Sequence, residues 1–367
     1  MRVGLDAGPA LAGRGGIGQY VRGLIQGFAE FHVPHEFRLY VPKGMASAPA
    51  LSEFAHINGM SWHPVHRWRW RWQGWRDRLD LYHGTNFKLQ TRGIHGTVLT
   101  IHDLWLSRFP EYSKKLWGER GAFRRTRRRV WSAQRVIAVS QATARDLQEL
   151  MGLPAERIRV VYHGVPPGFY PDHDRATWIQ VKQHLGLPDN PYLLFMGGAD
   201  PRKNHRLVYR VLSRAPSTLR DYVLVAVGSH RSRGGDLVET AREMKIAERV
   251  HAVGSVTTPV LRLLYSHATA LVFPSLYEGF GFPVLEAMAC GTPVITSRTT
   301  ALPEVAGEAA LLVDPSDEAE LLQAIVDLVA NEALRQRLVT KGFQQVSRFT
   351  WTQTAAQTLA VYEELCG

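Results

Sequence analysis

The sequence predicts an α/β protein of two domains, each built on a parallel sheet with helices on both faces. Apolar, β-branched runs alternate with segments of helical periodicity along both halves of the chain, which is typical of a doubly wound sheet. A Pro- and Gly-rich break at residues 163–171 separates the halves. The length of 367 residues also suits two hydrophobic cores better than one.

The stretch from residue 270 to 297, ALVFPSLYEGFGFPVLEAMACGTPVITS, is the most informative. It predicts a strand, a Gly-rich loop, a short helix that Pro283 opens and Gly291 ends, and a second strand. Glu278 follows the first strand, and Glu286 lies among apolar residues of the helix. A buried Glu is costly without a partner, so each carboxylate either bonds the backbone as a cap or binds a ligand. The glycines of the loop let backbone N–H groups approach a phosphate at the helix N-terminus.

In the first half, helical spacing begins at Tyr20, after a Gly-rich loop that contains Gly15 and Gly16. That loop is either a phosphate cradle or a tight turn, and it lacks the Lys-Ser/Thr of a P-loop. His102 lies at the carboxyl end of a predicted strand, where ligands collect in a doubly wound sheet, although a lone His is more often structural. The strands are predicted at 3–7, 35–41, 81–87, 97–104, 135–139 and 158–161, with a helix over 143–151 that Ser140 caps.

The second half repeats the alternation. One predicted strand leads through Gly197 and Gly198 to Arg202 and Lys203 at a helix start. Adjacent Arg and Lys provide a fork-like donor and a point charge for an anion, unless both are simply solvated. The strands are predicted at 192–196, 222–227 and 250–253, and helices at 318–330, 332–346 and 352–365.

Composition excludes several classes of protein. A hydrophobic content of 45% and a charged content of 21% are ordinary for a soluble globular protein. The two cysteines, Cys290 and Cys366, provide neither a disulfide framework nor a cluster of metal ligands, which fits a reducing compartment. No signal-like segment follows Met1 and no apolar run approaches the ~20 residues of a membrane span, so we expect a cytoplasmic protein.

The net charge of +11 is concentrated in two stretches. Residues 62–78 carry a net charge of +4 and residues 114–129 carry +7. The first stretch interleaves Arg with five of the ten tryptophans, which suits an anionic lipid interface or a strand that packs one dry face internally. The second is either a solvated helix face or a membrane-binding surface. We therefore expect an anionic membrane surface as a further partner, at the inner face of the cell membrane.

The motif FPS-x-x-EGFG-x-P-x-LEAMACGTPVI resembles the Glu-x7-Glu signature of retaining GT-B glycosyltransferases, and specifically of glycosyltransferase family 4. The loop GGIG-x-Y and the elements TIHDL and PRKN also resemble this family, and the match is densest over 190–316. The resemblance implies the GT-B fold, in which two Rossmann-like domains face each other across a cleft. We expect an acceptor-side domain at 1–168, a nucleotide-sugar domain at 169–349, and a helix at 350–367 that crosses back to the first domain.

The resemblance implies a role for each matched residue. Arg202 and Lys203 would stabilise the leaving diphosphate. Glu278 would hold hydroxyls of the transferred sugar, and His102 would face that sugar. Glu286 would accept hydrogen bonds from the ribose. The other implied donor-binding residues are Gly15, Gly16, Gly198, Ser255, Val256, Gly279, Phe280 and Gly281.

We therefore expect a metal-independent, retaining hexosyltransferase. The donor would be a nucleotide-diphosphate sugar, with GDP-mannose expected by resemblance to bacterial polysaccharide mannosyltransferases. The acceptor would be a glycan or a lipid-linked glycan in cell-surface polysaccharide synthesis. No cofactor is expected, since Arg202, Lys203 and a helix N-terminus already face the diphosphate.

Two alternatives remain open at this point. One is a GT-B sugar-nucleotide epimerase, and the other is a nucleic-acid-binding protein on a vestigial fold. The intact charged set of Arg202, Lys203, Glu278 and Glu286 argues against nucleic acid as the partner. The segment Asp172-His173-Asp174 has the Asp-x-Asp pattern of metal-dependent transferases. No strand precedes it in the linker, so we interpret this match as chance.

Overall fold

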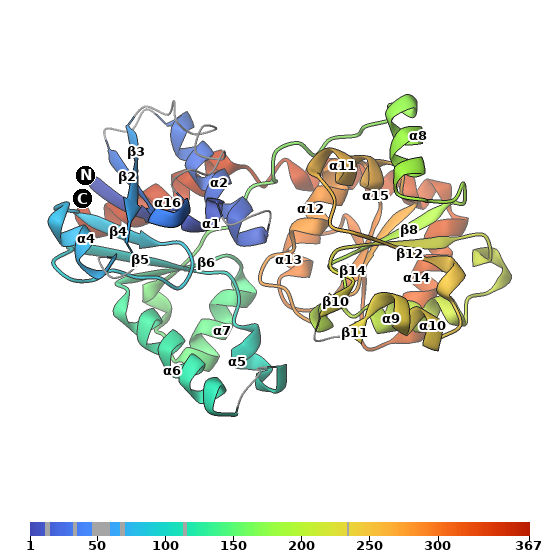
Figure 1. Cartoon of the computed structure of the whole chain (residues 1–367), viewed down its shortest axis with the longest axis horizontal. Helices are drawn as coiled ribbons and strands as arrows, with labels where there is room; N and C mark the ends of the chain where they lie inside the picture. The colour runs from blue at the N-terminus through green and yellow to red at the C-terminus, as the bar shows by residue number, and fades with distance from the viewer. Residues whose placement is uncertain (12–14, 32–34, 46–58, 67–69, 113–115, 233–234) are drawn as a thin grey trace. The chain divides into compact units, whose positions relative to one another are not determined.

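The computed structural model describes residues 1–11, 15–31, 35–45, 59–66, 70–112, 116–232 and 235–367, with the backbone alone for residues 70–71 and 116–122. The chain divides into two compact units (Figure 1). The first unit comprises Met1–Gly164 together with Phe349–Gly367. The second comprises Val165–Arg348.

A parallel sheet forms the centre of the first unit. Its strands are β1 (Arg2–Asp6), β2 (Glu36–Pro42), β3 (Met60–Val65), β4 (Leu81–Gly84), β5 (Gly96–Ile101), β6 (Arg135–Ala138) and β7 (Ile158–Val160). Within the described residues, these seven strands lie in the order β3-β2-β1-β4-β5-β6-β7. From β1 the chain adds β2 and β3 on one side, and it then adds β4 to β7 on the other side of β1. A doubly wound sheet places its ligand crevice at this switch point, between β1 and β4. The predicted strands of this half are thus confirmed.

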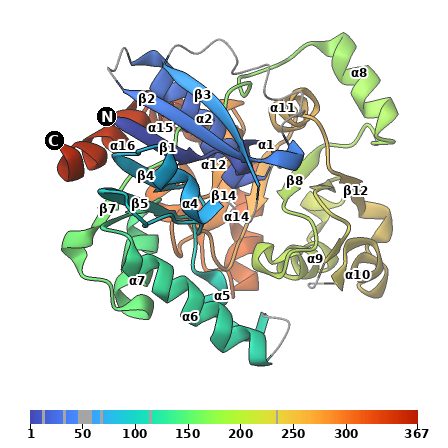
Figure 2. The same ribbon diagram turned by 60° about the vertical axis from the view of Figure 1, so that its left-hand side comes forward.

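Helices cover both faces of the first sheet, as Figures 1 and 2 show from two directions. The helices are α1 (Gly8–Leu11), α2 (Gly16–Glu30), α4 (Trp70–Arg76), α5 (Trp105–Arg108), α6 (Leu116–Ser132), α7 (Gln141–Met151) and α16 (Trp351–Cys366). α2 packs on α16, while Val130 of α6 and Leu147 of α7 share a core with Leu99 of β5. Ser140 caps α7 as predicted, because its hydroxyl accepts from the Thr143 N–H. Among the described residues, no helix has the length and hydrophobicity that crossing a membrane requires.

The Trp- and Arg-rich stretch forms a strand and then a helix. β3 ends at Val65, residues 67–69 lie outside the described residues, and α4 begins at Trp70. The interpretation of this alternation as a single strand is therefore wrong over α4. The side chains of Trp72 and Trp75 are 46% and 59% exposed, so these two indoles do not pack internally.

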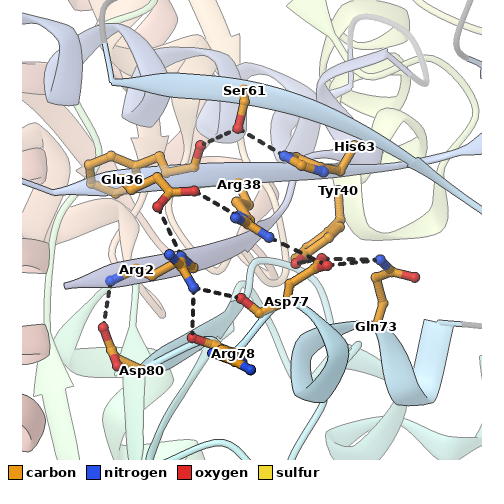
Figure 3. Close-up of polar contacts among 11 residues, drawn as sticks. Arg2, Glu36, Arg38, Tyr40, Ser61, His63, Gln73, Asp77, Arg78 and Asp80 are labelled. Atoms are coloured by element: carbon orange, nitrogen blue, oxygen red, sulfur yellow. Dashed lines mark hydrogen bonds and ion pairs between the residues drawn. The ribbon is translucent and has the colours of Figure 1, made fainter.

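A polar network joins α4 to the first sheet (Figure 3). The Asp77 carboxylate accepts from the Tyr40 hydroxyl at 2.6 Å and from the Gln73 amide at 3.1 Å. Arg2 of β1 donates to Glu36 of β2 at 2.9 Å and to the Asp77 carbonyl at 3.1 Å. Burial and the Asp77 carboxylate raise the pKa of Tyr40 above its ordinary value, so the phenol remains a donor. The network thereby fixes the position of the exposed indoles of α4.

The second unit is also built on a parallel sheet. Its strands are β8 (Tyr192–Met196), β9 (Val223–Val227), β12 (Val250–Gly254), β13 (Ala270–Phe273), β14 (Val294–Ser297) and β15 (Ala310–Val313). Within the described residues, these six strands lie in the order β12-β9-β8-β13-β14-β15. A separate small hairpin pairs β10 (Arg231–Ser232) with β11 (Gly235–Asp236). The predicted strands of this half are confirmed as β8, β9 and β12.

The helices of the second unit also lie on both faces of its sheet (Figure 1). They are α8 (Arg175–His184), α9 (His205–Ser213), α10 (Leu237–Glu243), α11 (Thr258–Ser266), α12 (Phe282–Ala289), α13 (Leu302–Ala306), α14 (Glu318–Ala330) and α15 (Glu332–Val346). α9, α10 and α14 share one core with alternate residues of the strands, such as Leu193 and Phe195 of β8. α11 and α12 lie on the opposite face, where α15 packs on α12.

The first residue of α16, Trp351, fits against a glycine of α2. A Cβ atom on Gly23 would lie 2.1 Å from the Trp351 ring, and the ring is buried. We expect Gly23→Ala to lower the free energy of unfolding by about 1–3 kcal/mol, because a packed ring must be displaced. Urea denaturation measures this change. The control is Gly44→Ala, for which nothing lies within 4 Å of the added atom. Equal losses in the two variants would contradict the packing argument.

Candidate active site

Two loops of the second unit meet at the carboxyl edge of its sheet. β8 lies between β9 and β13, and parallel strands end on the same edge. Residues 197–204 follow β8, and residues 274–281 follow β13. The Leu276 N–H donates to the Arg202 carbonyl at 2.7 Å, which ties one loop to the other.

Lys203 and Glu278 form a buried ion pair between these loops. Lys203 Nζ lies 2.5 Å from Glu278 Oε1, and the two side chains are only 14% and 11% exposed. Lys203 Nζ also lies 4.9 Å from the centre of the Phe273 ring. The lysine stem covers Gly197, where a Cβ atom would lie 2.4 Å from Lys203 Cγ. Because charges withdrawn from water need partners, each member fixes the other at this edge.

Arg202 lies next to this pair in sequence and is held by Asp200. The guanidinium donates to Asp200 Oδ2 from Nη2 at 2.8 Å and from Nε at 3.1 Å. Burial acts to raise the pKa of Asp200, but the hydrogen bond and charge of Arg202 lower it overall. Asn204, at φ 62°, donates to the carbonyls of Pro274 and Pro315 at 3.2 and 2.7 Å. The sequence analysis missed Asp200 and the supporting role of Asn204, although Asn tolerates a left-handed backbone.

The glycines around this edge allow close backbone approach. Gly279, Phe280 and Gly281 form a buried loop before α12, and Gly281 caps that helix at φ 109°. The N-terminus of α12 brings roughly half a positive charge to the loop. Gly198 has φ 60°, and a Cβ atom there would lie 2.3 Å from the Ser229 carbonyl oxygen. Only glycine lets the turn after β8 approach the loop after β9 so closely.

Glu286 is buried on α12 and has a side-chain partner. It accepts a hydrogen bond from the Tyr265 hydroxyl of α11 at 3.0 Å. Burial and the neighbouring Glu286 raise the pKa of Tyr265, so the phenol remains a donor. The sequence analysis missed this tyrosine. The two residues predicted at the nucleobase follow β12, where Ser255 is exposed and Val256 is half-buried.

Three of the predicted residues belong to the first unit. Gly15 and Gly16 are exposed at the start of α2. His102 follows β5 and donates from Nε2 to the Thr85 carbonyl at 2.8 Å. Burial lowers the pKa of His102 to about 4, against the opposing effects of Thr85 and a nearby Asp. The neutral ring then carries its proton on Nε2, and Nδ1 is left as an acceptor.

A second histidine of the first unit has a structural role. His83 bonds the Tyr362 hydroxyl through Nδ1 at 2.6 Å and the Thr100 hydroxyl through Nε2 at 2.7 Å. The side chain is fully buried, and both ring nitrogens are occupied by protein groups. It therefore joins α16 to β5 and leaves no nitrogen for a substrate.

The Asp-x-Asp segment of the linker is likewise engaged by the protein. Asp172 pairs with Arg262 at 2.8 Å, and Asp174 caps α8 by accepting from the Ala176 N–H at 3.0 Å. In the part of the chain that the structure describes, no group of three or more His, Cys, Asp and Glu side chains is arranged to hold a metal ion.

Comparison with known proteins identifies the family. Residues 14–169 match glycosyltransferase family 4, and residues 177–345 match the glycosyl transferases group 1. The chain is 32% identical over 301 residues to O-antigen chain mannosyltransferase B of Escherichia coli. The aligned region covers 80% of this chain and 78% of that protein. The chain belongs to glycosyltransferase family 4. The resemblance predicted from its motifs is thus confirmed.

Two further matches extend the comparison of this family 4 glycosyltransferase. D-inositol 3-phosphate glycosyltransferase of Thermomonospora curvata is 32% identical over 244 residues, and the match spans 63% of this chain but 57% of that protein. HepE of Anabaena, solved in complex with UDP and glucose, has a TM-score of 0.73 at 18% identity and covers 99% of each chain. The enzyme therefore has the GT-B fold, with two Rossmann-like parallel sheets.

The protonation of His102 is open to direct measurement. Because burial lowers its pKa to about 4, we expect its ring to stay neutral, with the proton on Nε2, between about pH 5 and 8. The unfolded chain takes up this proton near pH 6.5, so His102 makes the free energy of unfolding fall as the pH drops from about 6.5 to about 4.

Nitrogen-15 NMR of histidine-labelled protein reports both the tautomer and the midpoint. A midpoint near 6.5 for His102, or a proton on Nδ1 in the neutral ring, would contradict the assignment.

Proposed function

We propose that this family 4 glycosyltransferase moves a hexosyl group, with retention of anomeric configuration, from a nucleotide-diphosphate sugar to a glycan or lipid-linked acceptor. The observation that carries the proposal is the buried Lys203–Glu278 pair, with Arg202 next to it. A diphosphate needs fixed cations, and a sugar needs fixed acceptors for its hydroxyls. This sheet edge offers both types of group from two adjoining loops.

The proposed chemistry follows from where charge develops. Breaking the bond between sugar and diphosphate places negative charge on the leaving oxygens and positive charge on the sugar ring. Lys203, Arg202 and the N-terminus of α12 stabilise the leaving group. Glu278 accepts from sugar hydroxyls, and Glu286 accepts from the ribose. The neutral His102 of the first unit offers Nδ1 to a further sugar hydroxyl.

We propose GDP-mannose as the donor, and cell-surface polysaccharide as the product. The support is the 32% identity to an O-antigen chain mannosyltransferase along four-fifths of the chain. That the donor is a nucleotide sugar is also supported by the UDP and glucose bound in HepE. We further propose that no divalent metal is required, because Arg202, Lys203 and a helix N-terminus offer hydrogen-bond donors and local positive charge to a diphosphate.

A transfer assay with a panel of nucleotide sugars tests this function. We expect turnover of GDP-mannose that persists in EDTA, and a product whose NMR spectrum shows the anomeric configuration of the donor. Lys203→Ala should lower kcat more than it raises KM, because charge on the diphosphate grows toward the transition state.

The matched control for this assay is Lys341→Ala. Lys341 pairs with Glu308 at 2.8 Å on the surface of the same unit, so its loss should leave both constants unchanged. Turnover that is lost in EDTA and restored by Mg²⁺ would refute metal independence. Conversion of the donor into an epimeric nucleotide sugar without any acceptor would point to an epimerase instead.

We also propose that the first unit docks on an anionic membrane to reach a lipid-linked acceptor. A hollow of about 410 Å³ on the surface of α6 is lined by Arg124, Arg127, Arg128 and Trp131. Trp131 is 41% exposed, and Trp72 and Trp75 of the same unit are also exposed. Guanidinium groups bind anionic headgroups, and indoles settle at the same depth of a bilayer interface.

Cosedimentation with vesicles tests this docking. The parent should bind anionic vesicles but not neutral ones at low salt. Binding should fail at 1 M salt, where the Debye length is about 3 Å instead of about 10 Å at 0.1 M. The triple change Arg124→Ser, Arg127→Ser and Arg128→Ser should abolish it. As a control of equal charge, Arg220→Ser, Arg242→Ser and Lys245→Ser remove three exposed cations of the second unit. Equal loss of binding in both triple variants would show that net charge, and not this surface, is responsible.

A further inference from the structure

Thr300 has an unusual backbone conformation for its residue type. It lies in the connection between β14 and α13, at φ 57°. A β-branched residue is a genuine outlier in this left-handed region. The neighbouring Thr299 hydroxyl is buried, and it has no hydrogen-bond partner among the described residues. Such local costs persist where the surrounding structure requires the conformation, and they concentrate at functional sites.

The surroundings of Thr300 show what requires this conformation. The Glu278 N–H donates to Thr300 Oγ1 at 3.1 Å. The Ala301 N–H donates in return to the Glu278 carbonyl at 3.4 Å. Behind the other end of the same loop, Leu302 Cδ2 would lie 2.8 Å from a Cβ atom on Gly281. Three successive residues thus brace both ends of the loop 278–281.

Together with Lys203, Thr300 fixes the position of the Glu278 carboxylate. The side chain of Glu278 is held by Lys203 at 2.5 Å, and its backbone is held by Thr300. A φ near +57° is what turns the Thr300 hydroxyl toward an amide of a loop distant in sequence. With an ordinary φ, the chain would leave β14 in another direction, and the Glu278 N–H would lose this acceptor.

We propose that Thr300 is a positioning residue for glycosyl transfer, which sets the direction in which Glu278 meets hydroxyls of the donor sugar. This inference rests on the proposed function, in which Glu278 holds the sugar. Thr300 itself touches no substrate in this proposal. Its effect should therefore appear in the sugar-dependent step and not in binding of the nucleotide.

Substitutions at position 300 separate this positioning role from a purely structural one. Thr300→Gly relieves the left-handed strain but removes the hydroxyl that accepts from the Glu278 N–H. These two effects oppose each other, so the free energy of unfolding should change little while kcat falls. Thr300→Ser keeps the hydroxyl and should keep the parent kcat. As a matched control, Thr299→Val removes the neighbouring hydroxyl, which bonds nothing in the described part of the chain. A structural role alone would lower the melting temperature without this kinetic pattern.

The experiment combines kinetics with amide exchange of the full chain. For Thr300→Gly we expect kcat with the nucleotide sugar to fall about tenfold or more, as for other small displacements of a positioned group. The dissociation constant for GDP should change by less than about twofold, because the diphosphate contacts remain. The Glu278 amide should exchange about tenfold faster or more with solvent, while Thr300→Ser and Thr299→Val match the parent.

The outcomes separate this inference from the proposed function. If the parent turns over no nucleotide sugar, the proposed function fails, and amide exchange still decides whether Thr300 fixes Glu278. If the parent is active and Thr300→Gly keeps both its kcat and the protection of the Glu278 amide, the inference is wrong while the function stands. Loss of kcat in Thr299→Val as well would also overturn it.

Discussion

The carboxyl edge of the second sheet depends on one charge pair that is almost withdrawn from water. Lys203 and Glu278 come from loops 75 residues apart, and neither ion would be stable there alone. The pairing therefore fixes both loops at once, and the shape around it follows. Gly197 makes room for the lysine stem. Asn204 donates to the carbonyls of Pro274 and Pro315, which lie in the loops that follow β13 and β15. A donor that binds here meets charges already oriented by the fold.

Much of this architecture is predictable from sequence because its signals are local. The strands are β-branched runs bounded by Gly and Pro. The loop before α12 is predicted by its glycines and by Pro283, which follows them. The contacts that finish the site are not local. Tyr265 meets Glu286 across two helices, and the φ of Thr300 depends on an amide 22 residues earlier in the chain. No spacing rule reports such contacts. In the Trp- and Arg-rich stretch, alternation of charge and indole resembled a strand, although the chain is helical over α4.

The first unit keeps its polar groups in two separate layers. Inside, a chain of hydrogen bonds runs from Tyr20 through Thr100 and His83 to Tyr362, and burial lowers the pKa of His83 to about 3. A neutral imidazole is well suited to such a chain, because it both donates and accepts. Outside, guanidinium groups and indoles gather on α6 and α4. His83 is thus uncharged in the interior of the unit, whereas the cationic groups of α6 and α4 lie on its surface.

The membership of α16 in the first unit has a consequence for biosynthesis. The first unit is interrupted in sequence by the whole of the second, residues 165–348, and it is completed only by residues 349–367. Domains fold as units while the chain emerges from the ribosome. The second unit can therefore be finished while the first still lacks α16, with the glycine-lined face of α2 open to water. The unit that begins the chain is the last to mature.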